Sequence, residues 1–251
     1  MPEAIIETTG LTKSFKGFRA VNDISFQVLP GTIHAMIGAN GAGKTTCFNL
    51  LTKFLSPTSG RILFKGRDIT SLKPDQIARL GLVRSFQISA VFGRLTALDN
   101  VKLALQRQRG ESYDFWGSLR RLDHHRQRAE QLLDDVGLGD VADTPAAELP
   151  YGRKRALELA TTLALDPQVM LLDEPLAGMG SEDVGRTAAL IRRVAEGRTV
   201  LMVEHNLGVV AELCDRITVL ARGEVLVEGD YATVSKDPRV IESYIGGAAH
   251  G

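Results

Sequence analysis

The sequence lacks the features that would place a protein within a membrane or outside the cell. Its apolar runs are short, such as Val169–Leu172, whereas a membrane-spanning helix needs about 20 mainly apolar residues. The segment Met1–Gly10 lacks the basic-then-apolar pattern of an export signal. The only cysteines, Cys47 and Cys214, lie far apart without metal-site spacing, so we expect buried free thiols in a reducing compartment. We therefore expect a cytoplasmic chain that reaches any membrane through a partner.

An excess of one charge sign is absent as well. The 30 Lys and Arg residues balance the 30 Asp and Glu residues, so the net charge gives no reason to expect a nucleic-acid or anionic-membrane partner. No fixed-period repeat or low-complexity segment is visible. A chain of 251 residues with 44% hydrophobic residues can bury a real core. We expect one elaborated domain or two closely packed subdomains.

Short apolar runs and helical patterns alternate along much of the chain. The runs are continuous, which is typical of parallel strands buried on both faces; they lie at Ile33–Ile37, Val169–Leu172, Thr199–Val203 and Ile217–Leu220. Helical spacing follows the first run at Cys47, Leu50, Leu51 and Phe54. Later helices are expected around Val184–Ala195 and Leu207–Cys214. This order predicts a core built on a parallel sheet.

Two stretches depart from the alternation. The first 30 residues carry short β-like runs, notably Ile24–Leu29, which glycine and proline separate. The region from about 88 to 165 is helix-rich; its apolar periodicity falls at Ala129, Leu132, Leu133, Val136, Leu157, Ala160, Thr161 and Ala164. Gly223–Gly229 predicts a short final strand, and the tail from Tyr231 predicts turns and a short helix. The sequence therefore predicts a parallel α/β core interrupted by a helical insertion.

A phosphate-binding pattern, G-x-x-x-x-G-K-[ST], lies between a predicted strand and a predicted helix. It reads Gly38-Ala39-Asn40-Gly41-Ala42-Gly43-Lys44-Thr45. Glycines let successive backbone N–H groups point at phosphate oxygens, and the following helix adds the positive end of its dipole. Lys44 can reach the β- and γ-phosphates, and the Thr45 hydroxyl can ligate Mg²⁺. The strand–loop–helix setting favours a nucleotide site over a plain glycine turn.

Two carboxylates end another predicted strand. Asp173 and Glu174 follow Val169–Leu172, at the strand end where open α/β sheets place their ligands. Asp173 can hold Mg²⁺ directly or through water. Glu174 can orient and deprotonate an attacking water, because phosphoryl transfer needs mainly positioning and charge neutralisation. An ordinary helix cap is the alternative, and the phosphate loop upstream favours catalysis.

These motifs, joined by two others, resemble those of the ATP-binding subunits of ABC transporters. The others are His205 and a segment upstream of the acidic strand, Leu149-Pro150-Tyr151-Gly152-Arg153-Lys154-Arg155. The resemblance runs from Phe15 to about Gly229, and the motif set is far more specific than the phosphate loop alone. Three segments are most similar to the branched-chain amino acid importer subgroup: Tyr151–Ala160, Ala177–Met179 and Arg239–Gly246.

The resemblance implies a fold and an assembly. The fold is α/β: a P-loop NTPase (RecA-like) core with an N-terminal antiparallel β subdomain and a helical insertion subdomain. Within one ABC-type nucleotide-binding domain, residues 1–87 and 166–230 would form the catalytic core, 88–165 the helical subdomain and 231–251 a C-terminal tail. The implied assembly is a homodimer, or a heterodimer with a related ATP-binding subunit, under transmembrane permease subunits at the inner face of the membrane. A solute-binding protein would be an indirect partner, and nucleic acid none.

The resemblance also implies residue roles. Phe15 falls where the family stacks an aromatic ring on adenine, with core packing as the alternative. Gln87 falls at the glutamine that contacts Mg²⁺ and the attacking water, and His205 at the switch histidine that hydrogen-bonds the γ-phosphate. The implied catalytic residues are thus Glu174, His205 and Gln87, and the implied Mg²⁺ ligands are Thr45, Gln87 and Asp173. The implied ATP contacts are Phe15, Gly38, Asn40, Gly41, Ala42, Gly43, Lys44, Thr45, Thr46, Tyr151, Gly152 and Arg153.

Two positions depart from the family pattern. In the family, ATP lies between the phosphate loop of one subunit and the signature segment, usually Leu-Ser-Gly-Gly-Gln, of the other. Here Pro150 stands at the serine position, and Gly180 stands where an aspartate is frequent in the dimer-crossing loop. Proline offers neither a hydroxyl nor an N–H, so one γ-phosphate contact worth about 1.5–3 kcal/mol should be missing. We expect a slower motor, with Arg153 as a compensating charge.

Several functions compete. The importer hypothesis includes a permease contact at Ile88–Leu98 around Val91 and Phe92, with internal packing as the alternative. An ATPase of a lipid- or lipopolysaccharide-exporting complex resembles the same subgroup. A non-transport ABC ATPase usually carries two cassettes in one chain, a long coiled coil or zinc-binding cysteines, and this sequence shows none of them. A P-loop kinase or GTPase is disfavoured because it would not need the signature segment or His205. The sequence favours an ATPase that powers import of a small polar solute, such as branched-chain amino acids.

Overall fold

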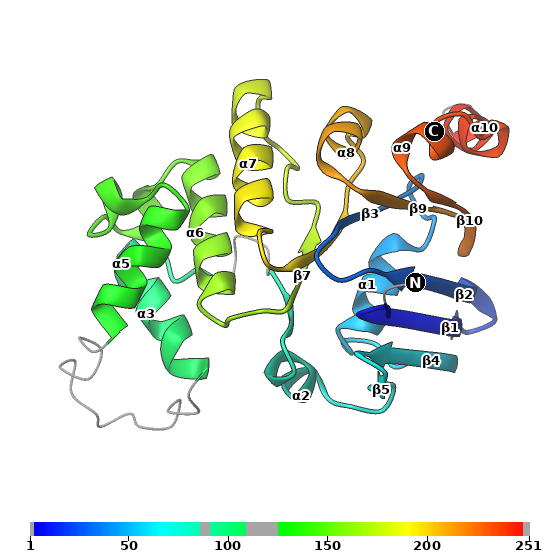
Figure 1. Ribbon diagram of the computed structural model, residues 1–251, viewed down its shortest axis with the longest axis horizontal. Helices are drawn as coiled ribbons and strands as arrows, with labels where there is room; N and C mark the ends of the chain where they lie inside the picture. Colours follow the sequence, from blue (N-terminus) through cyan, green and yellow to red (C-terminus); the bar gives the residue numbers. More distant parts are fainter. Residues whose placement is uncertain (1–2, 86–90, 109–124, 248–251) are drawn as a thin grey trace.

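A computed structural model describes residues 3–85, 91–108 and 125–247, whose strands form two sheets (Figure 1). The larger sheet has the order β10-β9-β3-β8-β7-β6, and the smaller one β2-β1-β4-β5. The larger sheet contains β3 (Ile33–Ile37), β6 (Leu82–Arg84), β7 (Val169–Asp173), β8 (Thr199–Val203), β9 (Arg216–Ala221) and β10 (Glu224–Gly229). The smaller contains β1 (Ile6–Phe15), β2 (Phe18–Val28), β4 (Ser59–Phe64) and β5 (Arg67–Asp68).

The larger sheet is parallel from β6 to β9, and its central strands are buried on both faces. β3 pairs in parallel with β8 and β9, and β7 with β6 and β8, whereas β10 runs antiparallel to β9. Every residue of β3 and β8 is buried, as their continuous apolar runs predict. Along β3, Ala35 and Ile37 enter one hydrophobic cluster and Met36 enters another, because alternate side chains point to opposite faces. The predicted parallel core is confirmed.

The smaller sheet and helix α1 (Lys44–Leu51) pack together on one face of the larger sheet. They share a hydrophobic cluster that contains Phe48 of α1, Ile62 of β4 and Leu171 of β7. β1 and β2 form a hairpin whose turn residues, Lys16 and Gly17, have φ values of 44° and 93°. Such left-handed pairs match the twist of a hairpin. The antiparallel N-terminal part of the predicted fold is thereby confirmed.

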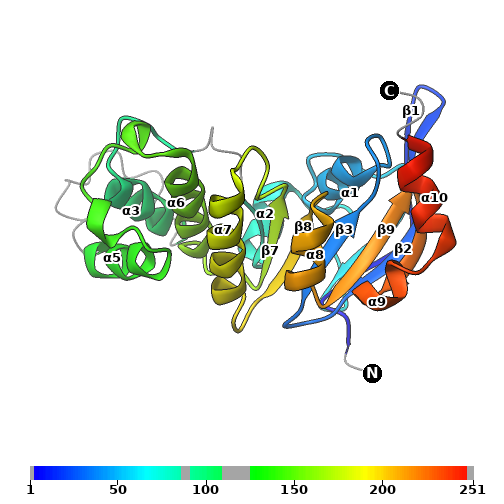
Figure 2. The ribbon, with the colours of Figure 1, turned by 90° about the horizontal axis from the view of Figure 1, so that it is seen from above.

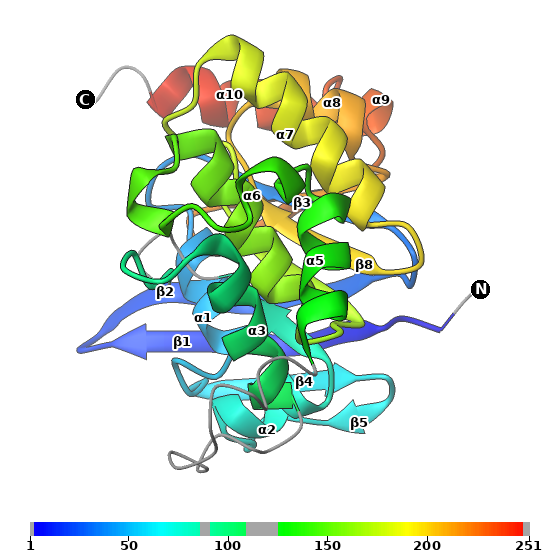
Figure 3. The same ribbon diagram turned by 90° about the vertical axis from the view of Figure 1, so that its left-hand side faces the viewer.

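Helices cover the opposite face and one end of the molecule. α7 (Ser181–Val194) and α8 (Leu207–Leu213) bury Ile191 and Val210 in the other hydrophobic cluster, the one that Ala35 and Ile37 of β3 enter. α3 (Ala97–Gln108), α5 (Arg126–Asp135) and α6 (Tyr151–Leu163) pack against one another at one end, as Figures 2 and 3 show. The remaining described helices are α2 (Pro74–Arg79), α9 (Tyr231–Val234), α10 (Pro238–Gly247) and the short turns η3 (Gly139–Val141) and η4 (Ala146–Glu148). A helical insertion between β6 and β7 is confirmed; its boundaries at residues 88 and 165 stay a prediction.

Helix α1 is shorter than its periodicity predicts. Its last residue is Leu51, and Lys53 has a φ of 60°. Helices commonly end with a residue in this left-handed conformation just past their last turn, and that residue is usually glycine. Phe54 therefore leaves the apolar face and is 54% exposed. The prediction that the helix extends to Phe54 was wrong, because α1 ends at Leu51 and Lys53 turns the backbone to a left-handed conformation.

Replacing Lys53 with glycine should stabilise the protein. Within the described chain the Lys53 Nζ is buried without a hydrogen-bond partner, and burial lowers the pKa of this ammonium while Asp68 opposes the change. Glycine removes both the buried ammonium and a left-handed strain of about 1–2 kcal/mol. We expect the free energy of unfolding in urea to rise by about 2–3 kcal/mol, of which about 1–2 kcal/mol comes from the relieved strain and the rest from removing the unpartnered ammonium. Lys16→Gly, at an exposed left-handed site, serves as the matched control for strain alone, and no gain over that control would contradict the argument.

A histidine is buried in the middle of the parallel sheet. His34 of β3 is 0% exposed, and its Nε2 lies 2.7 Å from the Thr218 Oγ1. Burial, helped by the positive charge of Arg216, lowers the pKa of His34 from 6.5 to about 3. The folded state therefore keeps the imidazole neutral over a pH range in which the unfolded chain binds a proton.

Stability should consequently fall in mild acid. Between pH 6.5 and 3 the unfolded state binds more protons at His34, so this contribution is fully present above pH 6.5 and is lost as the pH falls. We expect the free energy of unfolding to drop by about 2 kcal/mol through this group between pH 7.5 and 5. Urea unfolding of the wild type and His34→Gln at both pH values measures it. An equal pH slope in the two proteins would show that His34 is not the cause.

The two cysteines are free thiols. Cys47 is buried in α1, whereas Cys214 lies just beyond α8 and is only half-buried, which corrects the expectation for that residue. Burial raises the pKa of each thiol to about 12, so neither is a reactive thiolate at neutral pH. Separately, none of the helices in the described ranges is long and apolar enough to cross a bilayer.

Candidate functional site

The phosphate-loop residues form the turn between β3 and α1. Gly38, Gly41 and Gly43 have φ values of 153°, 79° and 102°. A Cβ on Gly38 would lie 2.2 Å from a backbone oxygen of β9, and one on Gly43 would lie 2.6 Å from a backbone oxygen of β2. Only glycine fits both places. Asn40 and Gly41 are exposed while Ala42 is buried, so the outer part of the loop faces open space.

Lys44, the first residue of α1, folds its side chain back over the loop. Its Nζ donates to the carbonyl oxygens of Gly38 at 2.7 Å and Ala39 at 3.0 Å. Burial lowers the pKa of Lys44, while the charges of Glu174 and Asp173 raise it. The structure therefore brings both predicted carboxylates within electrostatic range of the loop lysine. The next two residues of α1, Thr45 and Thr46, are exposed and half-buried.

Asp173 and Glu174 stand at the carboxyl end of β7. Asp173 is the last residue of the strand, and its side chain is 12% exposed. Glu174 is half-buried and has a φ of 46°, a left-handed conformation that costs energy in any residue except glycine. Its backbone N–H donates to the Val203 oxygen of β8 at 3.0 Å. Such strain persists only where the surroundings fix the backbone, and it is common at functional sites.

Arg84 pairs with Asp173, a contact that sequence reasoning missed. Arg84 ends β6, which lies beside β7 in the sheet. Its Nη2 donates to the Asp173 Oδ2, and its Nη1 donates to the Asn49 Oδ1 at 2.7 Å. No motif marks this residue. Only the order of the strands reveals that a cation at the end of β6 reaches the carboxylate at the end of β7.

Glu204 is the second residue that sequence reasoning missed. It follows β8, and its side chain is 0% exposed. Its Oε2 accepts hydrogen bonds from the backbone N–H groups of His205 at 2.9 Å and Asn206 at 3.1 Å, and its Oε1 accepts from that of Leu176 at 3.3 Å. This buried carboxylate thus fixes the loops after β7 and β8 together. The His205 side chain is 64% exposed beside it. A carboxylate next to a histidine at a strand end was the available signal.

The loop and strand ends fit the phosphate tail of a nucleotide with Mg²⁺. The Lys44 ammonium lies on the inner side of a glycine loop whose outer turn is open, which suits phosphate oxygens. The Asp173 carboxylate and the Thr45 hydroxyl are oxygen donors of the kind that Mg²⁺ prefers. The arrangement can neutralise phosphate charge and hold a carboxylate, Glu174, near an attacking water.

Phe15 and Gln87 complete the predicted site on the core. Phe15 ends β1 and is 42% exposed, with the Lys13 Nζ 5.1 Å from its ring centroid. This exposure differs from the core packing that the alternative required, and adenine stacking stays a prediction. Gln87 lies outside the described residues.

The predicted signature segment begins helix α6. Pro150 is its N-cap and makes no side-chain capping bond. The Tyr151 hydroxyl donates to the Ala177 oxygen at 2.8 Å, in the loop that follows the acidic strand end. A Cβ on Gly152 would lie 3.6 Å from the carboxyl carbon of Asp183. One subunit thus ties its own signature segment to its own post-β7 loop.

Arg153 and Gly180 bear on the departures from the family pattern. Arg153 forms an ion pair with Asp140 at 2.9 Å, and the two side chains are 41% and 62% exposed. An exposed pair of this kind holds weakly, so the guanidinium stays available for another anion. Gly180 is the N-cap of α7 and offers no side-chain cap. Among the described residues, no hydrogen bond or ion pair joins 151–153 to the phosphate loop.

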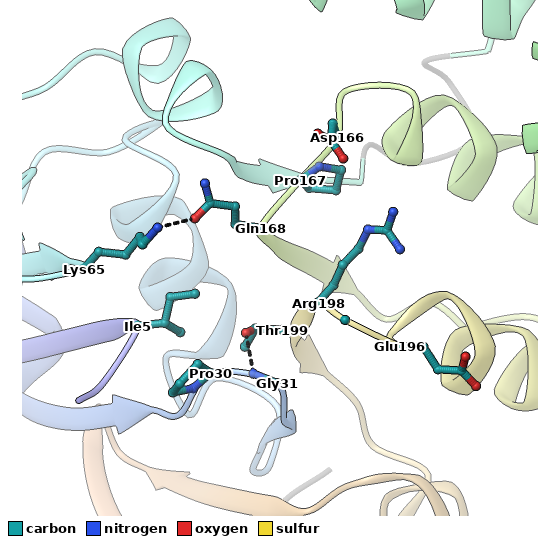
Figure 4. Close-up of a pocket in the computed structure, with 11 residues that line it drawn as sticks. Ile5, Pro30, Gly31, Lys65, Asp166, Pro167, Gln168, Glu196, Arg198 and Thr199 are labelled. Carbon is teal, nitrogen blue, oxygen red and sulfur yellow. Dashed lines mark hydrogen bonds between the residues drawn. The ribbon is translucent and has the colours of Figure 1, made fainter. Parts of the chain in front are cut away.

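A pocket of about 640 Å³ lies at the amino ends of the parallel strands (Figure 4). Four of its lining residues pair with one another: Lys65 donates to the Gln168 side chain at 2.8 Å, and the Gly31 N–H donates to the Thr199 hydroxyl at 2.9 Å. Open α/β sheets bind ligands at the opposite, carboxyl ends. The predicted nucleotide site lies at those ends, away from this pocket.

Known proteins are similar to this chain along almost its whole length. Residues 21–177 match the ABC transporter family, and residues 224–250 match the family of branched-chain amino acid ATP-binding cassette transporters. The high-affinity branched-chain amino acid transport ATP-binding protein LivG of Escherichia coli (strain K12) is 35% identical over 256 residues, covering 99% of this chain and 100% of LivG.

Solved structures agree with the predicted fold. The ADP conformation of an ATP-binding cassette of an ABC transporter is 29% identical, has a TM-score of 0.85, and covers 97% of this chain and 99% of its own. A dimeric ATP-binding cassette in a post-hydrolysis state with ADP and phosphate is 25% identical, has a TM-score of 0.75, and covers 90% of this chain and 98% of its own. The chain therefore belongs to the ATP-hydrolysing, ATP-binding subunits of ABC transporters, in the branched-chain amino acid group that includes LivG.

Proposed function

We propose that this chain hydrolyses ATP to drive import of branched-chain amino acids or related small polar solutes. The observation that carries the proposal is the placement of Lys44 over the phosphate loop, within electrostatic range of the carboxylates that end β7. The choice of solute follows from the likeness to LivG over almost the whole chain. This chain supplies the energy, while the permease and solute-binding partners would select the solute.

Each core residue has a role in the proposed reaction. Lys44 and the loop N–H groups bind the β- and γ-phosphates, because an ammonium and oriented amides neutralise phosphate charge. Glu174 accepts a proton from the attacking water, and its fixed backbone keeps the carboxylate in place. The His205 imidazole hydrogen-bonds the γ-phosphate, while the buried Glu204 accepts a hydrogen bond from the backbone N–H of His205 and fixes its main chain. Thr45, Asp173 and Gln87 would hold Mg²⁺, which would supply further charge neutralisation at the phosphates.

We propose that a second subunit completes the ATP site. Tyr151 and Gly152 stand at the surface where α6 begins, and the positive end of a helix dipole suits a γ-phosphate. The ring of Phe15 lies exposed on the core for the adenine. The mate is a second copy or a related ATP-binding subunit, and a dimer is the state of one solved relative.

Replacing Pro150 with serine should raise the rate of ATP hydrolysis or the affinity of the ATP-driven dimer. Serine restores a hydroxyl and an N–H at the start of α6, and one charge-assisted hydrogen bond of about 1.5–3 kcal/mol corresponds to a factor of about ten or more. We expect a rise of about tenfold in ATPase rate or in ATP-driven dimer affinity. Pro145→Ser, which changes the proline before the short turn η4, serves as the control. If neither the ATPase rate nor the dimer affinity changes in Pro150→Ser, the missing contact at residue 150 limits neither hydrolysis nor dimerisation.

We also propose that the helical region from 88 to 165 carries the permease contact and holds the chain at the inner, cytoplasmic face of the membrane. Phe92 is 57% exposed, whereas Val91 packs against the hydrophobic core. Of these two predicted contact residues, we therefore keep only Phe92 as a contact with the permease. The Asn100 side chain accepts a hydrogen bond from the Phe92 N–H at 2.8 Å and holds this segment on α3. Residues 88–90 of the predicted patch lie outside the described residues.

Reconstitution tests the whole proposal. The chain is co-expressed with the permease subunits from its own gene cluster, purified in detergent and placed in proteoliposomes with the matching solute-binding protein. We expect co-purification and ATP-dependent uptake of labelled leucine, isoleucine or valine. Uptake that is absent while a lipid stimulates the ATPase would favour the exporter alternative and overturn the importer.

A further inference from the structure

We propose that the Arg84 guanidinium takes the place of the metal cation at the Asp173 carboxylate. This guanidinium neutralises Asp173 when no metal is bound, and Asp173 would exchange this partner for Mg²⁺ when nucleotide binds. The inference rests on the proposed function, because it takes Asp173 as a ligand of the metal.

The Arg84 guanidinium has a fixed place. It bonds to Asp173, its Nη1 lies 2.7 Å from the Asn49 Oδ1, and its central carbon lies 6.0 Å from the Phe54 ring centroid. The Arg84 and Asp173 side chains are only 16% and 12% exposed. An arginine fork held on three sides loses little further freedom when it pairs. This is a built contact, unlike an exposed surface pair.

Charge balance explains why Asp173 needs this cation when no metal is bound. Asp173 and Glu174 are adjacent carboxylates, and the Lys44 ammonium is committed to two loop carbonyl oxygens. A largely buried carboxylate without a partner is strongly destabilising. Lys44 acts on Asp173 only at a distance, whereas Arg84 places a positive charge directly on its carboxylate.

The same contact must compete with a metal. A guanidinium on one carboxylate oxygen repels a dication and takes up part of the negative charge that would attract it. When Mg²⁺ arrives, Arg84 keeps Asn49 and the Phe54 ring as partners, so its release from Asp173 does not strand a buried charge. Arg84 therefore weakens Mg²⁺ binding and pairs with Asp173 again once the metal has left.

Arg84→Gln tests the competition, because glutamine removes the charge and can still hydrogen-bond to its neighbours. Two quantities are measured: the Mg²⁺ concentration that half-saturates the ADP-bound protein, by calorimetry, and the melting temperature with and without Mg²⁺ and ADP. We expect the half-saturating Mg²⁺ concentration to fall about three- to tenfold. We expect the metal-free melting temperature to fall by about 5–10 °C, with much of this deficit removed by Mg²⁺ and ADP.

Arg216→Gln is the matched control, because Arg216 also pairs with a carboxylate, that of Glu228 at 2.7 Å, on another part of the sheet. Its deficit in melting temperature should persist with Mg²⁺ and ADP, and its Mg²⁺ requirement should match the wild type. If Arg84→Gln does not fold, Arg84→Met carries the same expectation.

An unchanged or raised Mg²⁺ requirement in the Arg84 variant would overturn the proposal, since Arg84 would then only position Asp173. A stability deficit that Mg²⁺ and ADP leave intact would overturn it too, and so would a failure of both Arg84 variants to fold even with Mg²⁺ and ADP. If the wild type itself does not bind Mg²⁺ with ADP, the proposed function fails instead.

Discussion

Glu174→Gln should lower steady-state ATP hydrolysis by about 10²–10⁴-fold while leaving Mg·ATP binding in place. Glutamine has the shape of glutamate but cannot accept the water proton at neutral pH. The backbone of residue 174, with its φ of 46° and its bond to β8, is equally accessible to glutamine, so the loss reports on chemistry rather than on folding. Phosphate release measures the rate, and a fluorescent ATP analogue measures binding.

Slow hydrolysis should also make the closed state of Glu174→Gln last longer. We expect light scattering to show a larger ATP-dependent increase in mass than for the wild type, given the correct mate. Glu212→Gln, an exposed carboxylate on α8, is the control and should hydrolyse at the wild-type rate. If Glu174→Gln also hydrolyses ATP at the wild-type rate, Glu174 is not the catalytic carboxylate.

Lys44→Ala should weaken nucleotide binding itself, by about 100-fold. The ammonium would bind two phosphate groups, and hydrogen bonds between charged groups are worth about 1.5–3 kcal/mol each. The same change removes the two hydrogen bonds from the Lys44 Nζ to the loop carbonyl oxygens, so the loop conformation is also less stable. Calorimetric titration with Mg·ATP measures the dissociation constant.

Lys65→Ala is the matched control for this loss. Lys65 also donates from its Nζ at 2.8 Å, but it lies in the pocket at the amino ends of the strands. Its removal should leave Mg·ATP affinity unchanged. Equal affinities in Lys44→Ala and the wild type would rule out the phosphate loop as the binding site.

Local patterns predicted the core elements well. The bounds of β3 and β8 agree with their apolar runs, because a strand buried on both faces needs an unbroken run. The turn between β3 and α1 was predictable because its glycines are required sterically. The end of α1 was not, because Lys53 adopts a conformation that normally needs glycine and so gave no stop signal.

The missed residues depend on sheet topology. Arg84 reaches Asp173 only because β6 and β7 are neighbours, although the whole helical insertion separates them in sequence. Glu204 joins two loops that only the pairing of β7 with β8 brings together. The signature segment was found by resemblance, yet its hydrogen bond from Tyr151 to Ala177 required the packing of α6 beside the post-β7 loop.

Hydrogen exchange at the phosphate loop tests the central claim most directly. The claim is that backbone N–H groups of residues 38–45 bind the phosphates of ATP. With Mg·ATP present, we predict slower amide exchange in a peptide covering 38–45 and no change in a peptide covering 196–199 at the opposite end of the sheet. If ATP binds and exchange at 38–45 stays the same, the nucleotide sits elsewhere and the account is wrong.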